Sequence, residues 1–142
     1  MSKQDLEIIA ANGDPMAISY DFLRSLPPFA RVDDVRALDK AAPEHCTAAV
    51  LSALIADDDR KGARSMLLEG ADGHSARLPL DEALERAVVI YQKDRQPLSP
   101  ADGGPFRLFI VDAAACKTAP LDKCATIKGL CRITLSKEPL GA

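Results

Sequence analysis

A short segment in the middle of the chain, Glu69–Leu80 (EGADGHSARLPL), narrows the range of possible folds considerably. Asp72 and Gly73 form a strong turn signal, because glycine adopts positive φ without steric cost. Arms at 65–69 and 74–78 flank this turn, and the pattern predicts a β-hairpin. The hairpin runs directly into acidic residues, which favour the first turn of a helix. A chain with this order packs strands together with helices.

The rest of the sequence predicts further helices and strands. Asp14 and Pro15 resemble a helix N-cap followed by proline at the first helical position. From hydrophobic periodicity we expect helices at 15–26, 44–56 and 81–92, an extended segment at 29–38, and strands at 106–111 and 126–135. The last strand alternates, with Cys131 on its apolar side. The predicted fold class is α+β, in which helices pack a mixed sheet made of the hairpin and the last two strands.

Length and composition describe an ordinary globular chain. With 142 residues we expect a single domain over 1–142. The net charge is −3, and basic residues do not cluster, which argues against nucleic acid as a partner. There is no signal-peptide core and no apolar run near the roughly 20 residues that span a bilayer. We therefore expect no membrane span, and a cytoplasmic location for the sequence as written, or a periplasmic one if a leader was removed.

The four cysteines do not form a metal-binding pattern. They stand at 46, 116, 124 and 131, without the close pairs of a zinc site. Cys131 is expected to be a buried thiol, whereas Cys116 and Cys124 are either loop thiols or a disulfide in an oxidising compartment. Cys46 falls near the start of a predicted helix, whose dipole would favour a thiolate. It is therefore the candidate reactive thiol.

The succession of motifs over 45–136 resembles a known family. A hairpin with Asp-Gly is followed by Leu-Pro-Leu-x-x-Ala-Leu, then by Asp-Gly-Gly-Pro-Phe-Arg-Leu, and finally by Ile-Lys-Gly-Leu. This order is similar to the molybdopterin-binding domain of the sulfite oxidase family, which includes the bacterial methionine sulfoxide reductase catalytic subunit. The resemblance implies a sulfite-oxidase-like fold and molybdopterin as cofactor. It also implies an anionic small molecule as the partner, a pterin or another such ligand.

The resemblance carries over to particular residues. The family motif H-G-x-P-x-R, which touches the pterin phosphate and ring edge, corresponds to 102–107, so it assigns cofactor contacts to Gly103 and Arg107. Asp102 stands where the family has a cofactor-binding histidine, and Lys128 matches the family lysine near the last strand. His74 occupies a hairpin position where the family often has an aromatic residue, and it is kept as a weaker cofactor-site candidate.

The metal ligand of the family is the main point of departure. In the family a cysteine thiolate ligates molybdenum, ahead of a Trp-rich segment and before a Gly-Val-x-Leu helix. In this sequence Cys46 is the one candidate metal ligand. It directly precedes Thr47–Leu54, the segment that resembles the family's Gly-Val-x-Leu helix, and is therefore too close to that helix to match the family's cysteine. We therefore expect a small stand-alone domain that has lost the ligand and acts as a ligand-binding or accessory protein. Two alternatives stay open: a molybdopterin-dependent oxidoreductase that uses Cys46, and a protein-interaction module without cofactor.

The two motif cations also have a purely structural interpretation. Arg107 and Lys128 either bind an anion or form ordinary ion pairs with Asp102, Asp112 or Asp122. The sequence leaves both interpretations open.

Overall fold

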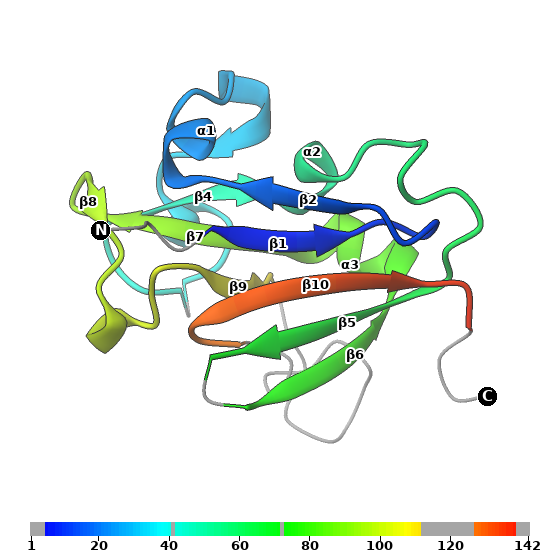
Figure 1. Cartoon of the computed structure of the whole chain (residues 1–142). Helices are drawn as coiled ribbons and strands as arrows, with labels where there is room; N and C mark the ends of the chain where they lie inside the picture. The colour runs from blue at the N-terminus through cyan, green and yellow to red at the C-terminus, as the bar shows by residue number, and fades with distance from the viewer. Residues whose placement is uncertain (1–4, 41, 72, 112–126, 139–142) are drawn as a thin grey trace.

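Two β-sheets form the body of the molecule (Figure 1). The computed structural model describes residues 5–40, 42–71, 73–111 and 127–138. In sheet order, the first sheet consists of β2 (Pro15–Ile18), β1 (Leu6–Ile9), β10 (Leu130–Ser136), β5 (Ser65–Gly70) and β6 (Ser75–Pro79). The second consists of β3 (Arg31–Val32), β4 (Cys46–Val50), β7 (Ala87–Lys93) and β8 (Gln96–Pro97), with β9 (Arg107–Ile110) also paired to β7.

Short helices connect and cover the strands. The α-helices are α1 (Tyr20–Arg24), α2 (Leu51–Leu54) and α3 (Leu80–Arg86), and 3-10 turns occur at Pro28–Ala30, Val35–Ala37 and Pro100–Asp102. The predicted α+β class is confirmed. In the first sheet β1 runs parallel to β10 while the other pairs are antiparallel, so this sheet is mixed. The prediction of one sheet was wrong, because β9 pairs in the second sheet and β10 in the first.

The main hydrophobic core contains residues of both sheets. Leu6, Ile8 and Ile133 contribute from the first sheet, and Val89 and Leu108 from the second. A smaller cluster, called the outer cluster below, covers the opposite face of the second sheet. It contains Val35, Ala42, Cys46, Ala48, Val88, Ile90, Leu98 and Phe109. The second sheet is thus covered on both faces, which explains why β7 and β9 read as continuous apolar runs.

The predicted hairpin is confirmed. β5 and β6 pair antiparallel, with Glu69 opposite Ser75, and Gly73 has φ of +88° in the connecting turn. The N–H of Gly70 donates to the carbonyl of His74 at 2.8 Å, which closes the loop.

The helix predicted at 15–26 is mostly wrong. Asn12 and Asp14 hydrogen-bond each other in the turn between β1 and β2, and Pro15 lies in the edge strand β2, where a missing N–H is tolerated. A short helix begins only after Ser19, whose hydroxyl accepts from the N–H of Phe22 at 3.0 Å. Asp14 therefore fixes a hairpin turn and is no helix cap.

The segments predicted as helices at 44–56 and 81–92 are each only partly helical. The first of them begins with a strand, and the second ends with one. The segment 46–50 is β4, and only 51–54 is helical. Similarly, α3 stops at Arg86, and the next seven residues form β7, whose first five residues are all buried. A fully buried strand has no alternating pattern, so apolar periodicity could not distinguish it from a helix.

The last strand and the segment at 29–38 follow the prediction in part. The stretch 29–38 contains two 3-10 turns around the two-residue strand β3.

In β10 a bulge lies between Leu130 and Arg132, so the alternation predicted for Cys131 is shifted. Cys131 is half-buried instead of buried, and its thiol donates to the carbonyl of Gly129 at 3.3 Å.

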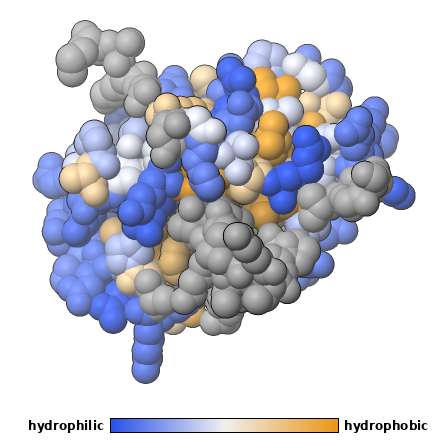
Figure 2. All heavy atoms as spheres, turned by 90° about the horizontal axis from the view of Figure 1, so that it is seen from below, coloured by the Kyte–Doolittle hydropathy of each residue, from blue (hydrophilic) through white to orange (hydrophobic). Residues whose placement is uncertain are grey.

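The surface seen from below in Figure 2 is mainly hydrophilic, with hydrophobic patches near its centre. Within the described ranges, no helix is long and apolar enough to cross a lipid bilayer. Cys116 and Cys124, predicted as loop thiols or a disulfide, lie outside the described residues. So do Asp112 and Asp122, two of the possible ion-pair partners of Arg107 and Lys128.

Candidate anion site at the Gly103 loop

The loop between β8 and β9 folds tightly back on itself. The N–H groups of Asp102 and Gly104 both donate to the carbonyl of Ser99, at 3.0 and 2.8 Å. Gly103 ends the 3-10 turn with φ of +94°, a left-handed conformation that favours glycine. The Gly104–Pro105 peptide bond is cis. This compact loop delivers the chain to β9, whose first residue is Arg107.

Backbone hydrogen bonds fasten this loop to the segment before β10. The N–H of Gly129 donates to the carbonyl of Gly103 at 2.7 Å, and the N–H of Leu130 donates to that of Phe106 at 2.7 Å. A Cβ at Gly103 would lie 3.0 Å from both Arg107 Cδ and Lys128 Cγ. The structure therefore brings Gly103, Arg107 and Lys128 together, as the motif comparison predicted.

Arg107 carries a buried donor without a partner. Within the part of the chain that the structure describes, its Nε atom has no hydrogen-bond acceptor. Burial lowers the pKa of the guanidinium below its ordinary value, while the charges of Cys46 and Asp102 raise it. Buried donors without acceptors are rare in native proteins, and each calls for an explanation. An anion held at Gly103 would supply an acceptor.

Asp102 is occupied by other groups and does not form the ion pair with Arg107 that the sequence allowed. Lys93 Nζ donates to one carboxylate oxygen at 3.2 Å, and Ser99 Oγ donates to the other at 2.9 Å. The hydrogen bond from Ser99, followed by that from Lys93, lowers the pKa of Asp102. Lys93 was missed by the sequence analysis. Recognition of 87–93 as a strand would have placed it at the strand end, beside this loop.

The lowered pKa of Asp102 predicts a pH-dependent contribution to stability. Because its pKa is lower in the folded state, the stabilisation is complete above the unfolded pKa and is lost as the pH falls through the folded one. The difference in melting temperature between wild type and Asp102→Asn should therefore be largest near neutral pH and shrink below about pH 4. Thermal melts from pH 7 to pH 2 measure this difference. A constant difference over that range would contradict the assignment.

His74 lies exposed in the loop between β5 and β6. The neighbouring Ala71 approaches the site, since its N–H donates to the carbonyl of Gly129 at 2.8 Å. The hairpin loop thus borders the anion site through its backbone. A cofactor contact by the His74 side chain stays a prediction.

Cys46 differs most from its predicted setting. It is the first residue of β4 and not part of a helix, so the helix dipole that was expected to favour a thiolate is absent. Its exposed fraction is 0%, and burial raises the pKa of the thiol, although the charges of Lys93 and Arg107 act in the opposite direction. Cys46 therefore lies close to the charged site, but as a protonated thiol within the outer cluster.

These properties predict a large difference in thiol reactivity. Iodoacetamide at pH 7 should modify Cys46 at least about tenfold more slowly than the half-buried Cys131, because alkylation requires an accessible thiolate. Peptide mapping by mass spectrometry separates the two cysteines. Equal labelling of both in the folded protein would show that Cys46 is open to solvent and ionised.

Two packed sheets, a glycine loop and a pair of cations at that loop characterise this α+β domain. A family model described as "Oxidoreductase molybdopterin binding domain" matches residues 38–140. The chain belongs to this family. Among solved structures, it is similar to the sulfane dehydrogenase SoxCD from Paracoccus pantotrophus, with a TM-score of 0.64 and 12% identity. The likeness at this identity concerns the fold. The match covers 98% of this chain and 39% of that one. No curated protein matches the sequence.

The described residues at the Gly103 loop differ in how well they suit the anionic part and the metal part of the family's cofactor. Two cations beside Gly103 suit an anionic group such as a phosphate: Arg107, whose Nε has no partner among the described residues, and the exposed Lys128. Cys46, the predicted metal ligand, is fully buried, and burial raises the pKa of its thiol. Among the described residues no three His, Cys, Asp or Glu side chains form a metal-binding group.

Proposed function

We propose that this domain binds an anionic small molecule, the phosphate-bearing part of a pterin or a related ligand, and acts as a binding or accessory protein without redox turnover. The anion is received by the guanidinium of Arg107 and the ammonium of Lys128, whose side chains lie against Gly103. The observation that carries the proposal is the buried Nε of Arg107, which has no partner among the described residues and lies beside a glycine that a Cβ would crowd.

The burial of Cys46 supports binding over catalysis. Molybdenum chemistry in this family belongs to the cofactor, and the protein contributes the thiolate and the orientation. The buried thiol of Cys46 contributes neither. The oxidoreductase alternative rests on the proximity of Cys46 to Arg107, whose charge acts on its pKa. It would require Cys46 to move out of the cluster that contains Val35, Ala42 and Leu98.

The direct test is the cofactor content of protein purified from a host that makes molybdopterin. Fluorescence of oxidised pterin and elemental analysis for molybdenum are measured on the same sample. Pterin with less than about one tenth of an equivalent of molybdenum is the expected result. Stoichiometric molybdenum would overturn the proposal in favour of the oxidoreductase. Protein with neither, which also fails to bind added phosphate or pyrophosphate, would favour the interaction module.

A matched pair of lysine variants locates the ligand. Lys128→Gln should lower the pterin content at least about fivefold, because it removes a charge-assisted hydrogen-bond donor from the site. Lys61→Gln removes an exposed lysine on the loop after α2 and should leave the content unchanged. Both lysines are exposed, so neither change is expected to affect folding. Equal pterin contents in the two variants would place the ligand elsewhere.

A further inference from the structure

A separate cavity of about 580 Å³ lies at the end of the second sheet, on the side away from Arg107. Arg107 pairs in register with Ile90, which packs in the outer cluster. The next residue, Tyr91, lines this cavity and packs in the core between the sheets. The two sites therefore lie on opposite faces of β7. The volume is within the range of small-molecule sites.

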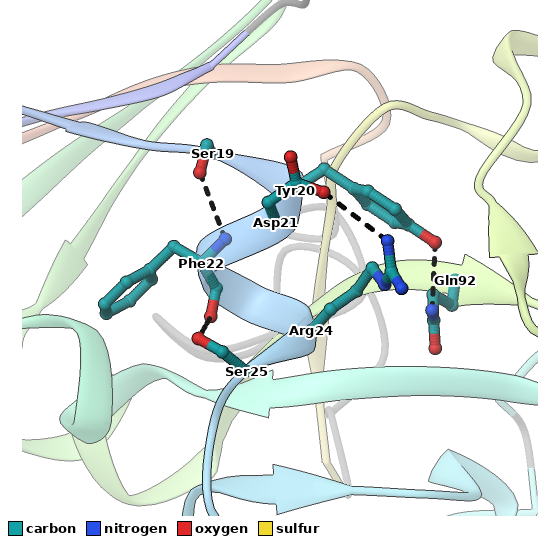
Figure 3. Close-up of polar contacts among 7 residues, drawn as sticks. All are labelled: Ser19, Tyr20, Asp21, Phe22, Arg24, Ser25 and Gln92. Carbon is teal, nitrogen blue, oxygen red and sulfur yellow. Dashed lines mark hydrogen bonds and ion pairs between the residues drawn. The ribbon is translucent and has the colours of Figure 1, made fainter.

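A bulge in β7 builds the wall of the cavity. Thr47 pairs with Gln92 and Ala48 with Ile90, which leaves Tyr91 without an opposite residue. A bulge of this kind turns two successive side chains to one side. Gln92 then donates to the hydroxyl of Tyr20 at 2.9 Å, in the arrangement of Figure 3.

Aromatic contacts hold this wall in place. The ring of Tyr20 packs edge-to-face on Tyr91 at a centroid distance of 6.1 Å. The guanidinium of Arg24 lies over Tyr20, 5.6 Å from the ring centroid. These contacts order the groups around the cavity without a ligand.

The backbone around the cavity is strained in an unusual way. At five described positions with left-handed backbone the chain uses glycine, and at three it does not. Those three are His45 with φ of 59°, Asp94 with φ of 53° and Arg95 with φ of 65°. All three line the same cavity. Asp94 and Arg95 form the two-residue turn between β7 and β8, where an Asn-Gly or Asp-Gly pair is preferred. The retention of a large side chain at position 95 lowers stability, a pattern typical of functional positions.

The charges around the cavity identify the chemistry of the ligand. Three arginines and three aspartates line the cavity; Arg31 is paired with Asp33 at 2.7 Å, and Arg24 with Asp21 at 3.4 Å. An ion of either sign would meet like charges, and no metal-binding group exists among the described residues. A molecule with one positive and one negative group satisfies both sets.

We infer that this cavity binds a small zwitterion of amino-acid or dipeptide size. Arg95 receives the carboxylate and Asp94 receives the ammonium group. This site is independent of the anion site at Gly103, so each proposal can fail without the other.

Calorimetry with charge-matched probes tests the ligand class. The probes are alanylalanine and the free L-amino acids, compared with N-acetylalanine, which lacks the ammonium, and alaninamide, which lacks the carboxylate. At least one zwitterion should bind with a Kd below about 1 mM, and both single-charge probes at least about tenfold more weakly. No zwitterion binding at about 10 mM, or equal binding of N-acetylalanine, would overturn the inference.

Variants of the strained turn separate function from structure. Arg95→Gln and Asp94→Asn should each weaken binding of the best zwitterion about tenfold, and asparagine tolerates the left-handed backbone. Arg95→Gly should abolish binding while it raises the melting temperature by roughly 3 °C, since it relieves the strain. Arg77→Gln, at an exposed position of β6, serves as the matched control and should bind normally. Unchanged binding in Arg95→Gln would refute the assignment, even if the anion site behaves as proposed.

Discussion

Gly104→Ala is expected to prevent stable folding. A Cβ at this position would lie 1.9 Å from the carbonyl oxygen of Leu98 and 2.9 Å from that of Ser99. Both obstacles are backbone atoms, which cannot rotate away as the end of a side chain can. The loop would have to open and lose the hydrogen bond from the N–H of Gly104 to Ser99. We expect a loss of more than about 4 kcal/mol, a large part of the stability of a typical domain.

Gly13→Ala provides the control for this change. Gly13 has φ of +92°, and nothing lies within 4 Å of a Cβ built there. That variant therefore reports the cost of the left-handed backbone alone, about 1 kcal/mol. Denaturant unfolding followed by circular dichroism compares the two variants with wild type. If Gly104→Ala were no less stable than Gly13→Ala, the close approach of the loop to Leu98 would not be required for folding.

Arg107→Met is expected to stabilise the protein and to abolish anion binding. Methionine fills much of the same volume and removes the buried donor that has no partner in the described part of the chain. The free energy of unfolding should rise by about 1 kcal/mol, while the pterin content falls by more than about tenfold. A higher free energy of unfolding together with weaker binding would show that Arg107 contributes to ligand binding and lowers stability.

The sign of the stability change distinguishes the two interpretations of this arginine. A structural ion pair would make Arg107→Met less stable, because its partner would be left unpaired. Arg77→Met changes an exposed arginine and should alter neither property. Chemical denaturation and pterin fluorescence on the same preparations decide the outcome.

The sequence predicted those parts of the fold that depend on local chemistry. The hairpin follows from Gly73, and β9 from the apolar run at 106–111 that contains Arg107. It failed where tertiary pairing decides between helix and strand. Val88 and Val89 are β-branched residues within an apolar stretch, and their pairing with β4 makes them a central strand. β1 was missed because its four residues gain their place only by pairing with β10 and β2.

The candidate sites could also be predicted only where their residues are close together in the sequence and do not depend on strand pairing. Gly103 and Arg107 belong to one continuous motif, and Lys128 to a second, so comparison with the family motifs was enough to associate them. Lys93 joins that site only through its place at the end of β7. The zwitterion cavity takes residues from 31–34, 45–47 and 91–95, which come together by the pairing of β3, β4 and β7. No local pattern in the sequence marks such a set.

The central position of β10 has a consequence for the order in which the protein can fold. β10 separates the β1–β2 pair from the β5–β6 hairpin, and its contacts include Arg132 to Glu7, 125 positions apart. During synthesis both pairs leave the ribosome before their shared neighbour exists. Until β10 is synthesised, each pair presents an unpaired strand edge that can pair with other chains. The risk of aggregation increases with the length of this interval. A nascent chain that stalls before residue 130 should therefore depend on chaperones, whereas one that has released β10 should become protease-resistant in a single late step.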